Sequence, residues 1–97
     1  MTQAILALHG GAGTIARQRM TSDKERAFVD AITGILARGQ ALLAEGAPAL
    51  EVVTQVVVLL EDCPLFNAGH GAVYTSAATH ELDAAIMDGH TLAAGAV

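Results

Sequence analysis

An apolar run that opens directly into a glycine-rich segment is the feature that most limits what this chain can fold into. Residues 4–8 read Ala-Ile-Leu-Ala-Leu, and the segment HGGAG follows at once over residues 9–13. The run predicts a short buried strand, and the glycines allow positive φ angles and a close approach to the main chain. Bare backbone N–H groups at such a place can hold an anion, a developing oxyanion or another piece of active-site backbone. A tight turn after a strand needs the same glycines, so the motif alone leaves both interpretations open.

The composition indicates that these residues do not cover their own apolar surface. Hydrophobic residues make up 53% of the 97 residues, and charged residues make up only 15%. A small domain has a large surface fraction and needs more charge than this to cover it. We therefore expect polypeptide outside this sequence to cover much of the surface, either as a partner subunit or as the rest of a larger domain.

Charge and cysteine content exclude several classes of protein. The net charge is −5 with five Lys and Arg residues, whereas nucleic-acid binding needs a clustered basic surface. No apolar run approaches the roughly 20 residues of a membrane span, and the N-terminus lacks the pattern of a secretory signal. The single cysteine, Cys63, suits a reducing compartment. We expect a cytoplasmic protein that binds neither nucleic acid nor membranes.

Apolar residues at helical spacing predict two consecutive helices. A capping box begins at Ser22, whose hydroxyl would accept a hydrogen bond from the Glu25 N–H. The apolar spacing continues until Gly46 predicts the end of this first helix, and Pro48 suits the first turn of the second. Segment 50–60 is rich in valine, yet its polar residues recur every three to four positions and do not alternate, which predicts a helix.

The second half of the chain reads as loops and short strands. Cys63-Pro64 ends the second helix. A glycine-punctuated loop, a short strand, a polar turn, a second strand, a hairpin turn and a third strand follow in that order: 65–71, 72–74, 75–79, 82–87, 88–90 and from about Leu92. The sequence then reaches Val97 inside an apolar strand, where natural domains seldom end.

The residue spacing argues against a zinc site, a lipase-type oxyanion loop and a phosphate-binding loop. His80-Glu81 begins like the HExxH zinc motif, but Ala84 stands where the second histidine is needed. The HGG segment also looks like the oxyanion loop of lipases, yet no G-x-S-x-G follows it. A phosphate-binding loop would need Lys and Ser or Thr after its glycines. The four histidines predict no transition-metal site.

Three motifs in a fixed order resemble one family of enzymes. They are His9–Gly13, the stretch CPLFNAGHGAVYT over Cys63–Thr75 and the stretch ELDAAIMDG over Glu81–Gly89, and LAAGAV follows near the end. Their wording and order look like the start of the isoaspartyl peptidase and plant-type L-asparaginase family of N-terminal-nucleophile hydrolases. The resemblance covers essentially all 97 residues. The joint occurrence of these motifs is specific, although each motif by itself is weak.

This resemblance implies an α/β fold, a four-layer αββα sandwich built from an α and a β subunit. Residues 1–97 would be the N-terminal portion of the α subunit, without an internal domain boundary. The precursor of such an enzyme cleaves itself, and the threonine that then begins the β subunit is the nucleophile, with its own α-amino group as base. The nucleophile, the oxyanion donors and the Arg/Asp pair that grips the substrate would lie outside this sequence. This chain by itself should therefore be inactive.

The resemblance also implies substrates and partners. The complete protein would be a hydrolase of small β-aspartyl dipeptides or L-asparagine, with no catalytic cofactor and an (αβ)2 assembly. Glycosylasparaginase and threonine aspartase relatives remain open alternatives, because their substrate distinctions lie in the absent half. A small acidic interaction module is the alternative outside the enzymes, and a folded monomer in solution would favour it.

A structural sodium ion is implied for the loop after the second helix. The resemblance assigns its ligands to main-chain carbonyl oxygens, those of Leu60, Glu61, Cys63, Phe66, Ala68 and His70. Hard cations take oxygen ligands, and the C-terminal end of a helix offers unpaired carbonyls. His70 departs from the aliphatic residue expected at its position, which ligation by the backbone tolerates. An ordinary helix-to-strand loop is the alternative.

Asn67, Gly10 and Gly11 are implied as support for the active site. Asn67 would help to hold the nucleophilic threonine, because its amide has two donors and an acceptor; an Asx turn is the alternative. Gly10 and Gly11 would border the nucleophile, where a side chain would collide with it. Asp83 and Asp88 flank one predicted strand, and we expect structural hydrogen bonds from them rather than catalysis.

Overall fold

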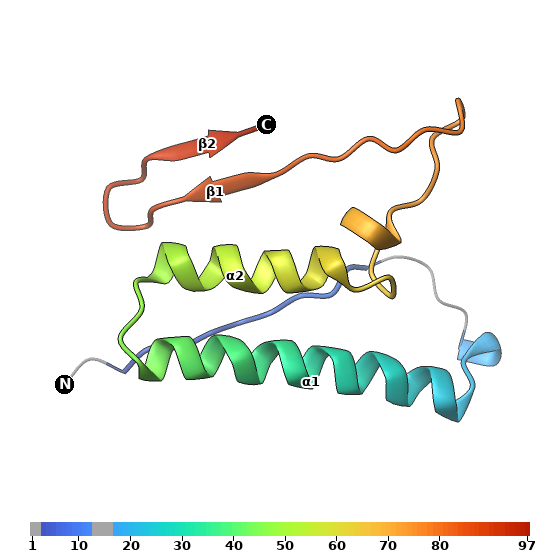
Figure 1. The fold of residues 1–97 in the computed structure, drawn as a ribbon, viewed down its shortest axis with the longest axis horizontal. Helices are drawn as coiled ribbons and strands as arrows, with labels where there is room; N and C mark the ends of the chain where they lie inside the picture. Colours follow the sequence, from blue (N-terminus) through green and yellow to red (C-terminus); the bar gives the residue numbers. More distant parts are fainter. Residues whose placement is uncertain (1–2, 13–16) are drawn as a thin grey trace.

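The computed structural model describes residues 3–12 and 17–97. This part of the chain contains two α-helices, two short 3-10 helices and a two-stranded hairpin (Figure 1). Their bounds in chain order are η1 Arg17–Arg19, α1 Ser22–Ala44, α2 Ala49–Asp62, η2 Gly69–Gly71, β1 Ala85–Met87 and β2 Ala94–Ala96. Gly13, the last residue of the glycine-rich segment, lies outside the described residues.

The N-cap of α1 is Thr21, so the prediction of Ser22 as the cap is wrong by one residue. Thr21 has extended backbone angles, φ −84° and ψ 160°, and its Oγ1 accepts a hydrogen bond from the Lys24 N–H at 3.1 Å. A cap residue needs extended angles so that its side chain can reach back to the first turn. Ser22 is already helical, and its side chain is therefore not placed to cap the helix.

A glycine turn separates α1 from α2, as the sequence predicts. Gly46 has φ +87°, an angle that glycine adopts without strain. Its N–H donates to the Leu43 carbonyl, and the Ala47 N–H donates to the Leu42 carbonyl, both at 3.0 Å. These bonds satisfy carbonyl groups that have no partner inside the helix. Pro48 stands before α2 as its N-cap rather than within its first turn.

The helical prediction for the valine-rich segment is confirmed by α2. Val52 and Val56 lie one helical turn apart and are buried, whereas Val53 and Val57 are exposed. This burial follows a helical period rather than the alternation of a strand. The helix ends at Asp62 with Cys63 as its C-cap, which agrees with the predicted stop at Cys63-Pro64.

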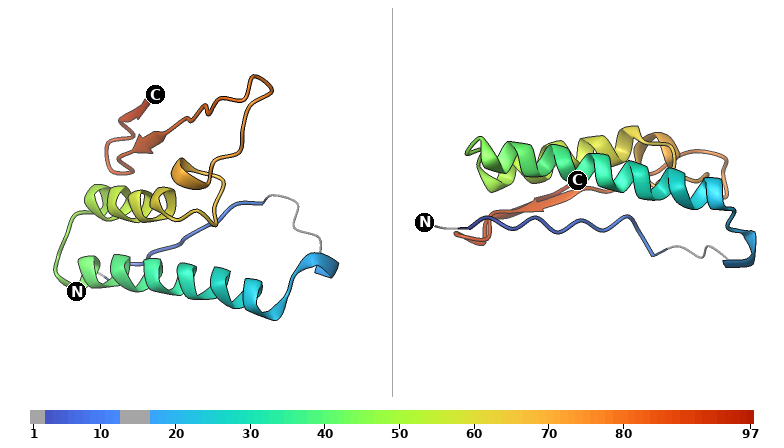
Figure 2. Two further views of the ribbon diagram at one scale, coloured as in Figure 1. Left: turned by 45° about the vertical axis from the view of Figure 1, so that its right-hand side comes forward. Right: turned by 90° about the horizontal axis from the view of Figure 1, so that it is seen from below.

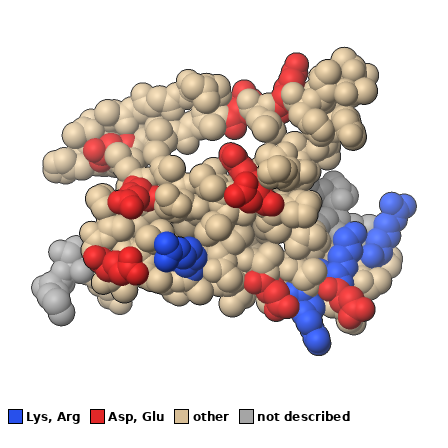
Figure 3. Space-filling view, viewed as in Figure 1, with Lys and Arg blue, Asp and Glu red and all other residues tan. Residues whose placement is uncertain are grey.

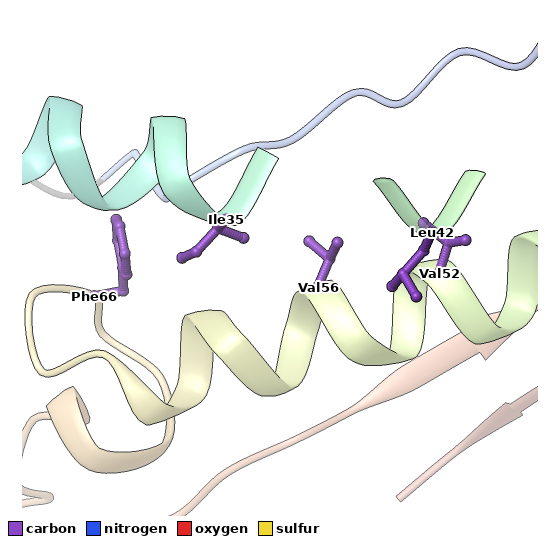
Figure 4. Close-up of a cluster of buried hydrophobic side chains, with 5 residues drawn as sticks. All are labelled: Ile35, Leu42, Val52, Val56 and Phe66. Carbon is purple, nitrogen blue, oxygen red and sulfur yellow. The ribbon is translucent and has the colours of Figure 1, made fainter. Parts of the chain in front are cut away.

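The helices form one layer of the molecule and the extended segments form a second. α1 and α2 lie side by side and run antiparallel (Figure 1). The right-hand view of Figure 2 shows residues 3–10 and the hairpin together on one side of the helices. The core lies between the helices and the loop after α2, and Figure 4 shows its buried side chains: Ile35, Leu42, Val52, Val56 and Phe66.

Residues 4–8 are extended but pair with no strand in the described part of the chain, so the predicted strand is not formed. Leu6 and Leu8 pack against the core, whereas Ile5 is 88% exposed. This alternation is that of a strand, but a strand also needs hydrogen bonds to a neighbour. The predicted strand at 72–74 is likewise not formed within the described residues.

The predicted hairpin is present, with shorter strands. β1 and β2 pair antiparallel, and Ile86 lies opposite Gly95. β1 is shorter than the predicted strand at 82–87, and β2 begins at Ala94 rather than near Leu92. Leu92 has φ +61° and belongs to the turn instead.

Local hydrogen bonds hold the hairpin turn at 88–90 and the polar turn at 75–79. The Asp88 Oδ1 accepts from the His90 N–H at 2.9 Å, which confirms a structural role for Asp88. Asp83 is exposed and makes no hydrogen bond among the residues that the structure describes. In the polar turn, the Thr75 N–H donates to the Thr79 carbonyl at 2.7 Å, and the two side-chain hydroxyls are 2.8 Å apart.

The surface is large for a chain of this size. Its solvent-accessible area is 7735 Å², whereas a compact protein of 9.9 kDa has about 5,200 Å². The radius of gyration is 15.5 Å, against about 12.5 Å for a compact domain of this length. Large apolar side chains are exposed along the extended segments: Ile5, Val73, Tyr74, Leu82, Ile86, Met87, Leu92 and Val97. The uncovered apolar surface that the composition predicts is therefore present.

Charged side chains are unevenly distributed over the surface. Figure 3 shows most Lys and Arg side chains near the start of α1, whereas Asp and Glu side chains are scattered over the helices and the extended layer. Asp23 and Glu25 lie beside Lys24 and Arg26 in the first turns of α1. Charges of both signs are thus mixed there, as on a solvated helix start.

α1 is long and apolar enough to cross a membrane, judged by length and composition alone. Core helices of soluble proteins meet the same criterion. Ile35 and Leu42 of α1 pack in the core with Val52 and Val56 of α2. The expectation that the protein binds no membrane stays a prediction.

Candidate functional site

The glycine segment and the loop after α2, which are far apart in sequence, lie next to each other in the structure. A Cβ atom placed on Gly10 would lie 3.1 Å from Phe66 Cε1 and 3.2 Å from Ile32 Cδ1. Phe66 is buried, and its ring packs edge-on against Phe28 with the centroids 6.1 Å apart. The structure therefore brings Gly10 next to the loop that carries the predicted sodium ligands and Asn67.

Gly10 and Gly11 are glycines for different reasons. The neighbouring rings and methyl groups leave little space for a side chain at Gly10. Gly11 has φ +107°, which side chains rarely tolerate, and no atom of the described residues other than its chain neighbours lies within 4 Å of the place that its Cβ would take. Its N–H donates to His9 Nδ1 at 3.0 Å. Packing therefore favours glycine at position 10, and backbone conformation favours it at position 11.

Asn67 bridges the loop to the segment that follows it. Its Oδ1 accepts a hydrogen bond from the Val73 N–H at 3.0 Å. An Asx turn would join the side chain to backbone about two residues on, so this longer bridge is a different arrangement. The side chain is exposed, and the two Nδ2 donors form no hydrogen bond among the described residues. Asn67 thus uses its acceptor within the loop, and its amide donors are not used by the described residues.

Four of the six predicted sodium ligands already accept a backbone hydrogen bond. The Leu60 and Cys63 carbonyls accept from the N–H groups of Cys63 and Phe66, at 3.3 and 3.4 Å. The Phe66 and Ala68 carbonyls accept from Ala68 and Gly71, at 2.8 and 3.0 Å. A carbonyl oxygen has two lone pairs, so each of these groups can accept one further interaction.

Two glycines let the loop fold closely over several carbonyl oxygens. A Cβ on Gly69, which has φ +52°, would collide with the Glu61 carbonyl oxygen. A Cβ on Gly71 would collide with the Phe66 carbonyl oxygen and would lie 2.7 Å from that of Pro64. Glycine at these two positions therefore lets the loop pack closely against the backbone of residues 61, 64 and 66.

The side chain of His70 lies at the surface rather than inside the loop. Its Nε2 is 3.8 Å from Asp62 Oδ1, and the two side chains are 75% and 66% exposed. Such an exposed pair contributes little to stability. Over residues 3–12 and 17–97, no three His, Cys, Asp or Glu side chains gather as metal ligands would.

An apolar groove separates α2 from the hairpin, and Glu61, one of the predicted sodium ligands, is among the residues that line it. It has a volume of about 750 Å³. Val53, Val57 and Val58 line it from α2, and Ile86 and Met87 line it from β1. These side chains are exposed in the structure, so the groove is an uncovered part of the packing surface.

The structural role of Phe66 and the contacts of Pro64 and Val73 are not predicted by the sequence motifs. Pro64 and Val73 take part through a backbone carbonyl and a backbone N–H, which leave no signal in the residue type. The Phe66 side chain does offer a signal, because the chain has only two phenylalanines. A bulky ring in a loop otherwise composed of small residues indicates an anchor to the core.

Comparison with known proteins decides which family these motifs represent. The family model described as asparaginase matches residues 2–97. The chain belongs to the asparaginase family. The resemblance inferred from the three motifs is therefore confirmed.

Several curated relatives are similar along almost the whole chain. The isoaspartyl peptidases of Salmonella typhimurium and Escherichia coli are 57% and 55% identical to it over 97 residues, which is 100% of this chain. The isoaspartyl peptidase/L-asparaginase of Homo sapiens is 44% identical over 94 residues, 96% of the chain. The chain spans only 31%, 30% and 29% of the lengths of these three relatives.

Proposed function

We propose that this chain is the N-terminal part of the α subunit of a threonine-nucleophile amidohydrolase. The family match over residues 2–97 carries the proposal. Relatives whose names are isoaspartyl peptidase and L-asparaginase indicate the substrates. The complete protein would hydrolyse β-aspartyl dipeptides and L-asparagine after cleaving itself, without a catalytic cofactor.

The exposed apolar surface supports a larger fold, the four-layer αββα sandwich. In it, α1 and α2 would form part of an outer layer, and residues 4–8 and the hairpin would join the sheet beneath them. Residues 4–8 have no hydrogen-bonded neighbour in the described chain, and both hairpin strands are exposed. Further strands, the β subunit of the same precursor and a second αβ unit in an (αβ)2 assembly would cover these surfaces.

The chemistry would be carried by a threonine at the start of the β subunit, outside these residues. Its hydroxyl would attack the amide carbonyl carbon while its α-amino group accepts the hydroxyl proton. The C–N bond then breaks, the amine leaves with that proton, and water hydrolyses the acyl-enzyme. The present chain would therefore supply residues that support the nucleophile, and the reacting groups would come from the β subunit.

Asn67 would support the nucleophile through its amide donors. Its Oδ1 is occupied by the Val73 N–H, so the orientation of the side-chain amide is set by the loop. The two Nδ2 protons are then the groups that can reach a hydroxyl or carbonyl oxygen of the β subunit. Gly10 and Gly11 would form the neighbouring wall of the site.

A sodium ion would stabilise the same loop through the carbonyl oxygens of Leu60, Glu61, Cys63, Phe66, Ala68 and His70. The all-oxygen donor set and the close folding at Gly69 and Gly71 support this assignment. An ion that binds only the folded state raises the melting temperature. The complete protein should therefore melt at a higher temperature in sodium chloride than in choline chloride of equal ionic strength, and equal melting temperatures would argue against the ion.

Intact-protein mass spectrometry of the complete purified protein tests the proposed function first. We expect two chains, the second of which begins with threonine, and release of the amino acid from a β-aspartyl dipeptide and of ammonia from L-asparagine. A single uncleaved chain without either activity would contradict the proposal. The proposed cytoplasmic location is tested by fractionation of cells that produce the protein, which should recover it in the cytoplasmic fraction.

Two variants at Asn67 test its role in the complete protein. Asn67→Ala removes the acceptor and the donors, whereas Asn67→Asp keeps an acceptor for the Val73 N–H and loses the amide donors. If the donors hold the nucleophile, both variants slow self-cleavage or hydrolysis without unfolding the protein. Wild-type rates of both steps in Asn67→Ala would contradict the role.

A further inference from the structure

Phe66 is the one buried residue in the described loop after α2. Its side chain is 6% exposed, whereas Leu65 beside it is 36% exposed and Asn67 is exposed. The ring contacts two separate parts of the chain, α1 and the glycine segment. It packs edge-on against Phe28 of α1, it belongs to the core cluster that Ile32 lines, and it lies against Gly10.

The contact at Gly10 leaves no spare space. The Cβ position of Gly10 is 3.1 Å from Phe66 Cε1 and 3.2 Å from Ile32 Cδ1, which is tighter than ordinary van der Waals contact. The φ angle of Gly10 is not positive, so the backbone itself would accept alanine. The ring therefore determines how near the glycine segment can lie to the loop after α2.

We infer that Phe66 is a positioning residue that sets the distance between the glycine segment and the Asn67 side chain. Asn67 is the next residue along the chain, and its amide is oriented by a single bond to Val73. If the Phe66 ring shifted between Gly10 and α1, the backbone of the glycine segment and that of Asn67 would move with it. The inference rests on the proposed function only in that Asn67 and Gly10 then face the same nucleophile.

The packing suggests a pair of variants that compensate for each other. Gly10→Ala adds a methyl group where Phe66 stands, and Phe66→Leu removes the ring atom nearest to it. Gly10→Ala overfills the space between Gly10 and Phe66, whereas Phe66→Leu leaves part of that space empty. The double variant restores part of the fit, which a purely structural loss at two independent sites would not do.

The first measurement is hydrogen–deuterium exchange of the complete protein, followed by mass spectrometry of peptides covering residue 73. The Val73 amide reports directly on Asn67, because it donates to the Asn67 Oδ1. We expect exchange in this peptide to be faster by about tenfold in Phe66→Leu and in Gly10→Ala, and slower again in the double variant. Leu42→Val, in the same core but away from the loop, is the control for a general loss of stability and should leave this peptide unchanged.

The second measurement is kinetic, with a β-aspartyl dipeptide as substrate. We expect each single variant to lower kcat by about tenfold or more with little change in KM, because misplacement of a supporting group acts on the reacting geometry. Leu42→Val should keep the wild-type value. Recovery in the double variant is expected in the exchange of the Val73 peptide rather than in kcat, because a methyl group at position 10 would also border the nucleophile.

The two measurements separate the possible failures. Unchanged exchange at Val73 in both single variants would overturn the positioning role of Phe66, whatever the activity. If the effects of the two changes on exchange at Val73 add up in the double variant, the positioning role is overturned as well. A wild-type protein that does not hydrolyse the dipeptide would overturn the proposed function, and the exchange measurement would still decide whether Phe66 positions Asn67.

Discussion

The helical layer of this chain forms its own backbone hydrogen bonds and its own core, whereas the extended layer does neither by itself. α1 and α2 make their own backbone hydrogen bonds and bury Ile35, Leu42, Val52 and Val56 against each other. In the extended layer, every residue of β1 and β2 is exposed, and residues 4–8 have no hydrogen-bonded neighbour within the described chain. A helix pair can thus form a core from one contiguous segment, whereas a sheet needs strands from elsewhere in the chain.

Leu42→Ala in the complete protein should give the largest effect, because it empties the centre of the helical layer. Leu42 is 6% exposed, and loss of a buried leucine costs about 3 kcal/mol of unfolding free energy. Val29→Ala on the outer face of α1, where the side chain is 56% exposed, should cost less than about 0.5 kcal/mol. Denaturant unfolding of both variants measures the difference, and equal losses would mean that the core is placed wrongly.

Ile86→Ala tests whether the extended layer is buried in the complete protein. Ile86 is 44% exposed in this structure, and such exposure alone predicts a loss below about 0.5 kcal/mol. If further strands and the β subunit cover the hairpin, the cost should rise to about 2 kcal/mol. Denaturant unfolding of the complete protein decides between these values, and the small one would contradict the sandwich architecture.

Two glycines of α1 should respond in opposite directions to alanine, because only one of them contacts the extended layer. A Cβ on Gly39 would collide with Leu6 and lie 2.9 Å from Val56 Cγ2, so Gly39→Ala should destabilise by about 2 kcal/mol through overpacking. Outside the backbone of α1 itself, no atom of the described residues lies within 4 Å of a Cβ position at Gly34, and Gly34→Ala should stabilise the helix by about 0.5–1 kcal/mol. The melting temperatures of the two variants provide the check; shifts of the same sign would show that Leu6 does not rest on Gly39.

The helix cap gives the smallest expected effect. Thr21→Ala removes the hydrogen bond from Thr21 Oγ1 to the Lys24 N–H and should cost about 1 kcal/mol. Ser22→Ala should change the stability very little, because Ser22 is already inside α1. A larger loss for Ser22→Ala than for Thr21→Ala, measured by denaturant unfolding, would restore the capping box that the sequence suggests.

The sequence predicts the helices and turns well, and the site residues stay predictions. Polar spacing predicts α2 despite its valines, and the turns at Gly46 and Asp88 have the expected residues at their tight positions. The predicted cap of α1 is one residue late because Thr21 and Ser22 are both good caps, and only the backbone angles distinguish them. The contacts of Gly10 with Phe66 and of Asn67 with Val73 join segments whose proximity no local pattern records.

The family, the two helices and the positions where these helices end can all be read from the order of the amino acids. Helical hydrogen bonds join residues four apart, and caps and turn glycines act within a few residues, so these features are written in local spacing. Two other features emerge only in three dimensions: residues 4–8 and 72–74 lack strand partners within the described chain, and Phe66 seats the glycine segment against the Asn67 loop. Strand pairing and side-chain packing depend on segments distant in sequence, and their outcome follows from which surfaces meet in space.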